Sequence, residues 1–364
     1  MIKKVERVII FFMDTEIIKI EDTEKSAKEI KRAGEILKAG GLVAFPTETV
    51  YGLGGDALQP DASKKIYAAK GRPSDNPLIV HIAQTEALSV ITDCIPKEAK
   101  LLADAFWPGP LTMILHKSAR IPYETTGGMD TVAVRMPKHP VALALIRAGG
   151  GFVAAPSANT SGRPSPTLAS HVADDLSGKI PMILDGGEVG IGIESTIIDL
   201  TEKTPMVLRP GYITPQMLSD VLGCEVKIDP GLIAADSNVK PKAPGMKYRH
   251  YAPKAQLTLV EGEERAVTGG INKLTNEAIE AGKKVGIIAA EETAQNYPQG
   301  IVKCIGARKD EDAIARHLYR ILREFDDLDV DLIYSESFRT PRIGQAIMNR
   351  LLKAAGHQVL QVTR

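Results

Sequence analysis

From residue 256 to residue 362 the chain alternates between short apolar runs and amphipathic helical patterns, and this alternation constrains the fold more than any other feature. It predicts strands at 256–260, 284–289, 302–306, 331–334 and 358–362, and helices at 264–281, 310–325 and 342–355. Strands separated by helices favour a parallel, doubly wound sheet. Because no glycine fingerprint follows any of these strands, nothing in this part of the sequence indicates nucleotide binding.

A chain of 364 residues is too long for one ordinary core, so two domains are expected. We expect a larger domain at residues 1–225 and a smaller one at 255–364. The segment between them, 226–254, shows no sustained periodicity and contains many prolines and glycines. Its second half, Ala243–Pro253, is aromatic and basic, which favours an active-site lid over an inert linker.

The 45 Lys and Arg residues balance the 45 Asp and Glu residues, so net charge gives no reason to bind nucleic acid or an anionic membrane. A local basic groove is still compatible with this balance. The three cysteines are widely separated and lack the close pairs of zinc sites or disulfide frameworks. An N-terminal apolar run is stopped by Asp14 before it reaches the length of a signal core or a membrane span. We therefore expect a reducing, cytoplasmic setting.

The clearest functional signal is the segment Lys70–Leu78, which leads into an apolar strand. An ammonium at Lys70 and a planar guanidinium at Arg72 complement a polyphosphate better than a single carboxylate. Two prolines restrict the backbone of the segment. An isolated Lys-Gly-Arg would be read as a solvated turn. Here Asn76 and His81 place polar groups at the start and in the middle of the strand, which favours a binding site.

Two more arginines, Arg135 and Arg209, end predicted strands. With Lys70 and Arg72 they make four cations at loop or strand ends of a neutral domain, a pattern that favours a polyanionic ligand.

Uncharged hydrogen-bonding side chains follow another strand, at Ser157, Asn159 and Ser165. Such groups bind phosphate or ribose oxygens, although a simple Ser/Asn/Pro turn explains them equally well. The segment 46–55, which is dense in hydroxyls and glycines, is predicted to be a loop. It is neither a Walker loop nor a dinucleotide fingerprint, so it indicates a plain turn as readily as a site.

Eight short motifs occur in the order FPTETVYGLG (45–54), KGRPSDNPLIVH (70–81), WPGPLT (107–112), TVAVRMP (131–137), APSAN (155–159), STIID (195–199), LRPG (208–211) and PGMKYRHYAP (244–253). Together they resemble the YrdC family and, within it, the long, two-domain threonylcarbamoyl-AMP synthases, over nearly the whole chain. The resemblance implies an α/β fold in which a large, twisted, mixed sheet with helices surrounds a cationic cavity, plus a smaller Rossmann-like C-terminal domain. It also implies a nucleotidyltransferase that makes threonylcarbamoyl-AMP and pyrophosphate from L-threonine, bicarbonate and ATP, for the t6A modification of tRNA.

The same resemblance assigns roles to individual residues. Those implied to surround L-threonine are Thr49, His81, Arg135 and Ala155. Those implied to bind ATP are Lys70, Arg72, Asn76, Thr131, Ser157, Asn159, Ser165, Arg209, Ala243 and Tyr248. Lys70 and Arg72 are expected to act in catalysis at the phosphates. Ala243 departs from the family pattern, because many relatives are expected to have a serine there, so the resemblance does not carry over a side-chain hydrogen bond from this position.

The resemblance implies Mg²⁺ as a companion of ATP, with no protein residue assigned as a metal ligand and no tightly bound cofactor. The implied functional partner is the threonylcarbamoyl transferase that acts on tRNA. No membrane contact is expected, and direct contact with RNA stays open, as do the oligomeric state and the role of the C-terminal domain.

Three other functions are compatible with parts of the sequence. A double-stranded RNA-binding module is disfavoured by the neutral charge and by the absence of an RRM or KH signature. Another carbamoyl-transfer enzyme of the same fold would be expected to carry acylphosphatase and zinc-finger segments, which this sequence lacks. A serine hydrolase using Ser157 would need a Gly-Xaa-Ser-Xaa-Gly turn, and none surrounds it.

Overall fold

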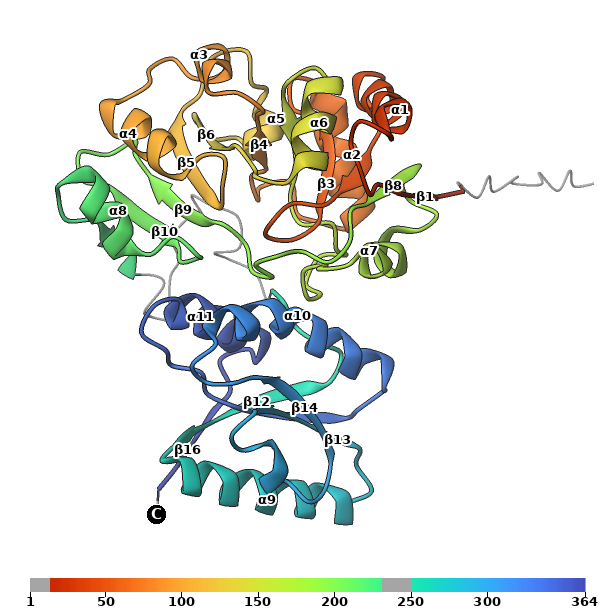
Figure 1. The fold of residues 1–364 in the computed structure, drawn as a ribbon, viewed down its shortest axis with the longest axis vertical. Helices are drawn as coiled ribbons and strands as arrows, with labels where there is room; N and C mark the ends of the chain where they lie inside the picture. Colours follow the sequence, from red (N-terminus) through yellow and green to blue (C-terminus); the bar gives the residue numbers. More distant parts are fainter. Residues whose placement is uncertain (1–13, 231–249, 364) are drawn as a thin grey trace, which may run out of the picture.

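The computed structural model describes residues 14–230 and 250–363. Within these ranges the strands form an 11-stranded and a five-stranded sheet, each in its own half of the molecule (Figure 1). The predicted α/β fold, with a large mixed sheet and a smaller doubly wound one, is confirmed. None of the helices in the described part of the chain is both long enough and apolar enough to cross a membrane.

The N-terminal half contains the large sheet, with strand order β1-β8-β2-β3-β7-β4-β6-β5-β9-β10-β11. Its strands are β1 (Glu16–Lys19), β2 (Val43–Phe45), β3 (Gly52–Asp56), β4 (Ile79–His81), β5 (Leu111–His116), β6 (Thr131–Arg135), β7 (Val153–Ala154), β8 (Met182–Asp185), β9 (Thr196–Asp199), β10 (Met206–Arg209) and β11 (Lys227–Ile228). Its helices are α1 (Ala27–Lys38), α2 (Pro60–Lys70), η1 (Thr85–Ala87), α3 (Leu88–Ile91), α4 (Lys97–Phe106), α5 (Tyr123–Thr126), α6 (Pro140–Ala148), α7 (Ala169–Leu176) and α8 (Pro215–Leu222).

Helix α1 shows how the sequence determines the packing of this half. Its buried residues Ile30, Ala33, Gly34 and Leu37 recur at helical spacing, so they form one apolar face. That face packs on α6 so closely that a Cβ at Gly34 would lie 2.6 Å from Ala148. Only glycine therefore permits this approach of the two helices.

Two segments of the N-terminal half differ from the prediction. Part of the expected loop at 46–55 is strand β3, which pairs antiparallel with β2. Lys70 is not in a loop but is the last residue of α2, where a cation interacts favourably with the helix dipole. Gly71 follows it with φ +61° and caps the helix, so the expected loop begins one residue later.

The C-terminal half is an all-parallel sheet of order β14-β13-β15-β12-β16. Its elements are β12 (Gln256–Gly262), α9 (Glu264–Glu280), β13 (Val285–Ala290), η3 (Ala294–Asn296), β14 (Ile301–Gly306), α10 (Glu311–Asp327), β15 (Leu332–Glu336), α11 (Gly344–Ala354) and β16 (Val359–Val362). Helix α9 covers one face of the sheet, and α10 and α11 cover the other (Figure 1). Because α10 and α11 lie between this sheet and the N-terminal half, they form the contact between the two halves.

Candidate functional site

One cavity in the N-terminal half brings together most of the residues predicted to be functional. Its lining includes Thr49, Lys70, Arg72, His81, Arg135, Ala155, Ser157, Asn159 and Arg209. These side chains come from the ends of α2, β4, β6 and β10, from the loop after α2 and from the turns after β2 and β7. Because β7, β4 and β6 are successive strands of the sheet, residues far apart in the sequence meet at this cavity.

At one end of the cavity the guanidinium of Arg135 is held on three sides. Its Nη1 donates to Thr49 Oγ1 at 2.9 Å, and its Nε donates to the Gly109 carbonyl at 3.2 Å. Its Nη2 forms an ion pair with Glu48 Oε1 at 2.7 Å. Thr49 also hydrogen-bonds to Thr47, at 2.8 Å between the hydroxyl oxygens. Arg135 is therefore fixed in orientation before any ligand binds.

His81 lies beside this group and is 4% exposed. Its Nδ1 is 3.1 Å from the carbonyl oxygen of Ile79. Burial, helped by the nearby charge of Arg135, lowers the pKa of His81 to about 3. The imidazole is therefore neutral at physiological pH, and the cavity has an uncharged donor or acceptor next to a fixed cation.

This burial predicts a specific loss of stability in acid. Below its unfolded pKa of 6.5, His81 is protonated in the unfolded chain but stays neutral in the folded one until about pH 3. The unfolded state then binds more protons, so this histidine makes the free energy of unfolding fall by about 1.4 kcal/mol per pH unit as pH decreases. Urea unfolding between about pH 6 and pH 4 should show a shallower fall for His81→Gln than for the wild type. The exposed His357→Gln is the control, and an identical slope for His81→Gln would contradict the prediction.

At the other end of the cavity the cations are Lys70, Arg72 and Arg209. The ammonium of Lys70 is 1% exposed and donates to the carbonyl oxygens of Ser157, at 2.5 Å, and Asn159. Burial, together with the charge of Arg72, lowers the pKa of Lys70 well below its ordinary value, and Asp175 opposes this shift. Lys70 therefore fixes the turn after β7 as well as lining the cavity.

Arg72 donates from Nε to the Asn76 carbonyl at 3.3 Å and from Nη2 to the Pro77 carbonyl at 3.2 Å. Burial lowers the pKa of Arg72 to about 10, which still leaves the guanidinium charged at neutral pH. The two carbonyls hold the planar guanidinium in place in the cavity wall, which Arg72 shares with Lys70.

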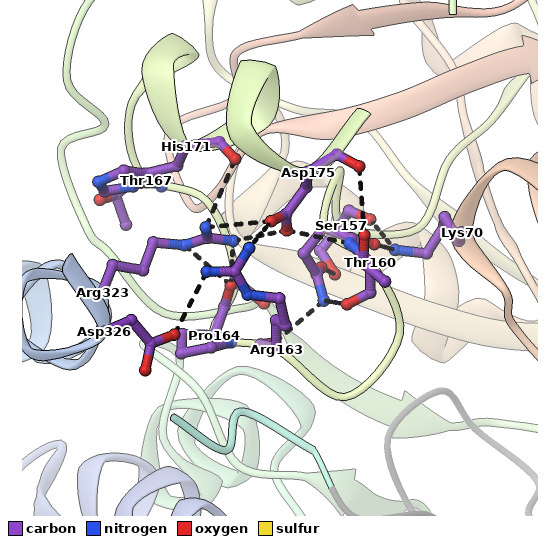
Figure 2. Close-up of polar contacts among 12 residues, drawn as sticks. Lys70, Ser157, Thr160, Arg163, Pro164, Thr167, His171, Asp175, Arg323 and Asp326 are labelled. Carbon is purple, nitrogen blue, oxygen red and sulfur yellow. Dashed lines mark hydrogen bonds and ion pairs between the residues drawn. The ribbon is translucent and has the colours of Figure 1, made fainter. Parts of the chain in front are cut away.

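The segment after β7 is also held from the C-terminal half (Figure 2). Asp175 of α7 accepts hydrogen bonds from Arg163, from the backbone N–H of Thr160 at 3.0 Å, and from Arg323 of α10 at 2.9 Å. Arg323 also donates from Nη2 to the Pro164 carbonyl at 2.6 Å. Residues 160–164, which follow Ser157 and Asn159, are thus clamped by charges from both halves.

The remaining predicted residues fall into two groups. Asn76, Thr131 and Ser165 are described but do not line the cavity: Asn76 is buried beside Arg72, Thr131 begins β6 at the end opposite Arg135, and Ser165 donates to Glu194 at 2.5 Å. Ala243 and Tyr248 lie outside the described residues, as does most of the segment interpreted as a lid.

The cavity is also lined by two residues that were not predicted as site residues, Glu194 and Ser195, and by His250 and Tyr251 of the segment interpreted as a lid. Ser195 binds Arg209, whose Nε donates to its carbonyl at 3.0 Å and whose Nη2 donates to its hydroxyl at 3.1 Å. The motif at 195–199 was a signal for this contact, but its partner is 14 residues away in the sequence. His250 and Tyr251 end the PGMKYRHYAP motif, which did point to this cavity.

Among the described residues no group of three or more His, Cys, Asp or Glu side chains is arranged to bind a metal ion. Glu194, which lines the cavity, is already engaged by Ser165, Tyr319 and Arg350, and Glu48 is paired with the lining residue Arg135. The described residues therefore fit a magnesium ion only as a companion of a phosphate ligand.

Fold and site together define an α/β protein with a cavity lined by buried cationic side chains. Residues 35–211 match the Sua5/YciO/YrdC family model, described as "Telomere recombination", and residues 213–356 match the model described as "Threonylcarbamoyl-AMP synthase, C-terminal domain". The chain belongs to the Sua5/YciO/YrdC family, in its two-domain threonylcarbamoyl-AMP synthase form.

Individual relatives agree with this assignment. The chain is 50% identical to the threonylcarbamoyl-AMP synthases of Pyrococcus abyssi and Bacillus subtilis, over 92% of its length and 96% and 94% of theirs. Its structure is similar to the crystal structure of Pyrococcus abyssi Sua5 complexed with L-threonine, with a TM-score of 0.89 and 47% identity over 96% of this chain and 99% of that one.

Proposed function

We propose that this chain is an L-threonylcarbamoyladenylate synthase, a nucleotidyltransferase that converts L-threonine, bicarbonate and ATP into threonylcarbamoyl-AMP and pyrophosphate. The observation that carries the proposal is the cavity itself, in which a fixed Arg135 with Thr49 and His81 adjoins a second group of cations. A relative that is 47% identical and has nearly the same fold was crystallised with L-threonine.

In this proposal the Arg135 end of the cavity binds L-threonine, with Thr49, His81 and Ala155 around it. The guanidinium pairs with the carboxylate of the amino acid, and the neutral His81 leaves the amine free to react. Ser157, Asn159 and Arg209, which line the cavity, are proposed to hold ATP, with Lys70 and Arg72 at its phosphates. Asn76, Thr131 and Ser165 are proposed to contribute to ATP binding from positions outside that lining. Ala243 and Tyr248 are proposed to reach the nucleotide from the segment 226–254, and His250, which lines the cavity, supports that arrangement.

The proposed reaction needs no protein nucleophile. The amine of threonine reacts with bicarbonate to form a carbamate and water, and a carbamate oxygen then attacks the α-phosphorus of ATP while pyrophosphate leaves. The protein contributes alignment of the two reactants and stabilisation of charge on the phosphoryl oxygens. Mg²⁺ bound to the phosphates would neutralise part of their charge. The carbamate and the adenylate both decompose in water, so a buried cavity would protect them from hydrolysis.

The product is proposed to pass to a threonylcarbamoyl transferase that modifies tRNA. A cytoplasmic setting is proposed as well, and the three exposed, unpaired cysteines are compatible with its reducing conditions.

The test is pyrophosphate release by the full-length protein with ATP and Mg²⁺. We expect release to require both L-threonine and bicarbonate, and we expect threonylcarbamoyl-AMP to appear in equal amount by mass spectrometry. Pyrophosphate release that is equally fast without threonine, or cleavage of ATP to ADP, would contradict the proposal.

A further inference from the structure

Two side chains of the C-terminal half reach the wall of the cavity. Tyr319 of α10 donates its hydroxyl to Glu194 Oε2 at 2.9 Å. Arg350 of α11, whose side chain is 0% exposed, donates from Nε to the same oxygen at 3.1 Å. Its Nη2 donates to the Glu194 carbonyl at 3.2 Å, and its Nη1 donates to the Pro210 carbonyl. One guanidinium therefore binds two separate segments of the N-terminal half.

These two segments carry the Arg209 end of the cavity. Glu194 precedes Ser195, and Pro210 follows Arg209. Ser195 and Arg209 line the cavity and hydrogen-bond to each other, at 3.0 and 3.1 Å. Arg350 thus contacts the chain neighbour of each member of this pair, so it links the two segments that carry Ser195 and Arg209 to the cavity.

Arg350 also keeps the carboxylate of Glu194 from pairing with Arg209. Glu194 is 6% exposed and lines the same cavity, so an uncompensated carboxylate there would attract Arg209. Instead its Oε1 accepts from Ser165 at 2.5 Å, and its Oε2 accepts from Tyr319 and Arg350. Burial by itself would raise the pKa of Glu194, but the charges of Arg350 and Arg209 outweigh it and lower the pKa, so the carboxylate is ionised. Arg209 donates to Ser195 rather than to this carboxylate.

We propose that Arg350 is a positioning residue for the nucleotide end of the cavity. By pairing with the ionised carboxylate of Glu194 and bridging residues 194 and 210, it keeps Arg209 available to the phosphates of ATP. This assigns the C-terminal half a part in the reaction, although it contributes no described side chain to the substrates themselves. The proposal rests on the ATP-dependent function proposed above.

The experiment measures ATP binding by calorimetry, and the KM for ATP and for L-threonine, in full-length variants. In Arg350→Met, Glu194 loses its guanidinium partner and is expected to turn to Arg209 and weaken ATP binding by about ten- to a hundredfold, while the KM for L-threonine changes less than about threefold. Arg350→Lys keeps the charge and should lose less. Arg320→Ala removes a contact between the halves at the exposed Glu188, away from the cavity, and should match the wild type.

The double variant Glu194→Gln/Arg350→Met separates this role from simple support of the fold. With no carboxylate left to capture Arg209, ATP affinity should recover to within about fivefold of the wild type, although Arg350 is still absent. A double variant that binds ATP as weakly as Arg350→Met, or an equal loss of ATP and threonine binding in Arg350→Met, would overturn the proposal. If the wild type itself neither binds ATP nor releases pyrophosphate, the proposed function fails instead.

Discussion

Arg72→Ala is expected to lower kcat/KM for ATP by about 10²–10³-fold, with a much smaller change in the affinity for L-threonine. The guanidinium is charged at neutral pH, because its pKa is lowered only to about 10, and two backbone carbonyls hold it in place. It is therefore organised before the nucleotide arrives, and its loss removes charge stabilisation that water cannot replace in a buried site. Arg135 and Thr49, at the other end of the cavity, keep their mutual hydrogen bond in this variant.

Steady-state kinetics with each substrate varied in turn, together with calorimetric titration of ATP, measures this difference. Arg72→Lys should be intermediate, because it keeps the charge but not the planar fork. Arg147→Ala, an exposed arginine of the same half, is the matched control and should leave both substrates unaffected. Equal losses for ATP and threonine, accompanied by a lower Tm, would mean that Arg72 supports the fold rather than the nucleotide.

Arg323→Met is expected to reduce the free energy of unfolding by about 3–5 kcal/mol, the largest stability effect that we predict. The ion pair between Arg323 and Asp175 is almost fully buried, with side chains 3% and 0% exposed (Figure 2). Removing the guanidinium leaves the buried carboxylate with fewer donors and also leaves the Pro164 carbonyl without its 2.6 Å hydrogen bond.

Chemical denaturation of the full-length protein measures the loss, provided that the two halves unfold in one transition. The exposed ion pair between Arg320 and Glu188 joins the same two halves, so Arg320→Ala serves as the control, with an expected cost of about 0–1 kcal/mol. In the double variant Asp175→Asn/Arg323→Met the loss should be smaller than the sum of the two single losses, since the second change no longer takes a guanidinium from an ionised carboxylate. A cost for Arg323→Met as small as that of the control would contradict the prediction.

The parallel C-terminal sheet could be predicted from the sequence because its helices and strands have strong local patterns. The buried face of α10, for example, repeats at Ile314, Leu318 and Leu322. Strand β3 was predicted as a loop because its three glycines and one leucine show no alternation of apolar and polar residues. Its extended conformation is stabilised instead by backbone pairing with β2.

Individual residues of the candidate site could be predicted from the sequence, but the contacts between them could not. Cations and hydroxyls in loops and at strand ends, such as Arg72, Arg135 and Ser157, can be recognised one segment at a time. The burial of the Lys70 ammonium against the turn after β7, and the contact of Arg209 with Ser195, depend on which strands are neighbours. The roles of Arg323 and Arg350 depend on how two halves pack, and nothing near either arginine in the sequence indicates a partner more than 140 residues away.

The two arginines that cross from α10 and α11 bear on experiments with fragments. If the N-terminal half were produced by itself, Asp175 and Glu194 would each lose a guanidinium partner and would meet bulk water instead. Water would solvate both carboxylates, so such a fragment would remain soluble. Its binding cavity would nevertheless change in shape and in electrostatic potential. Affinities measured on that fragment would then describe a different electrostatic environment from that of the whole chain.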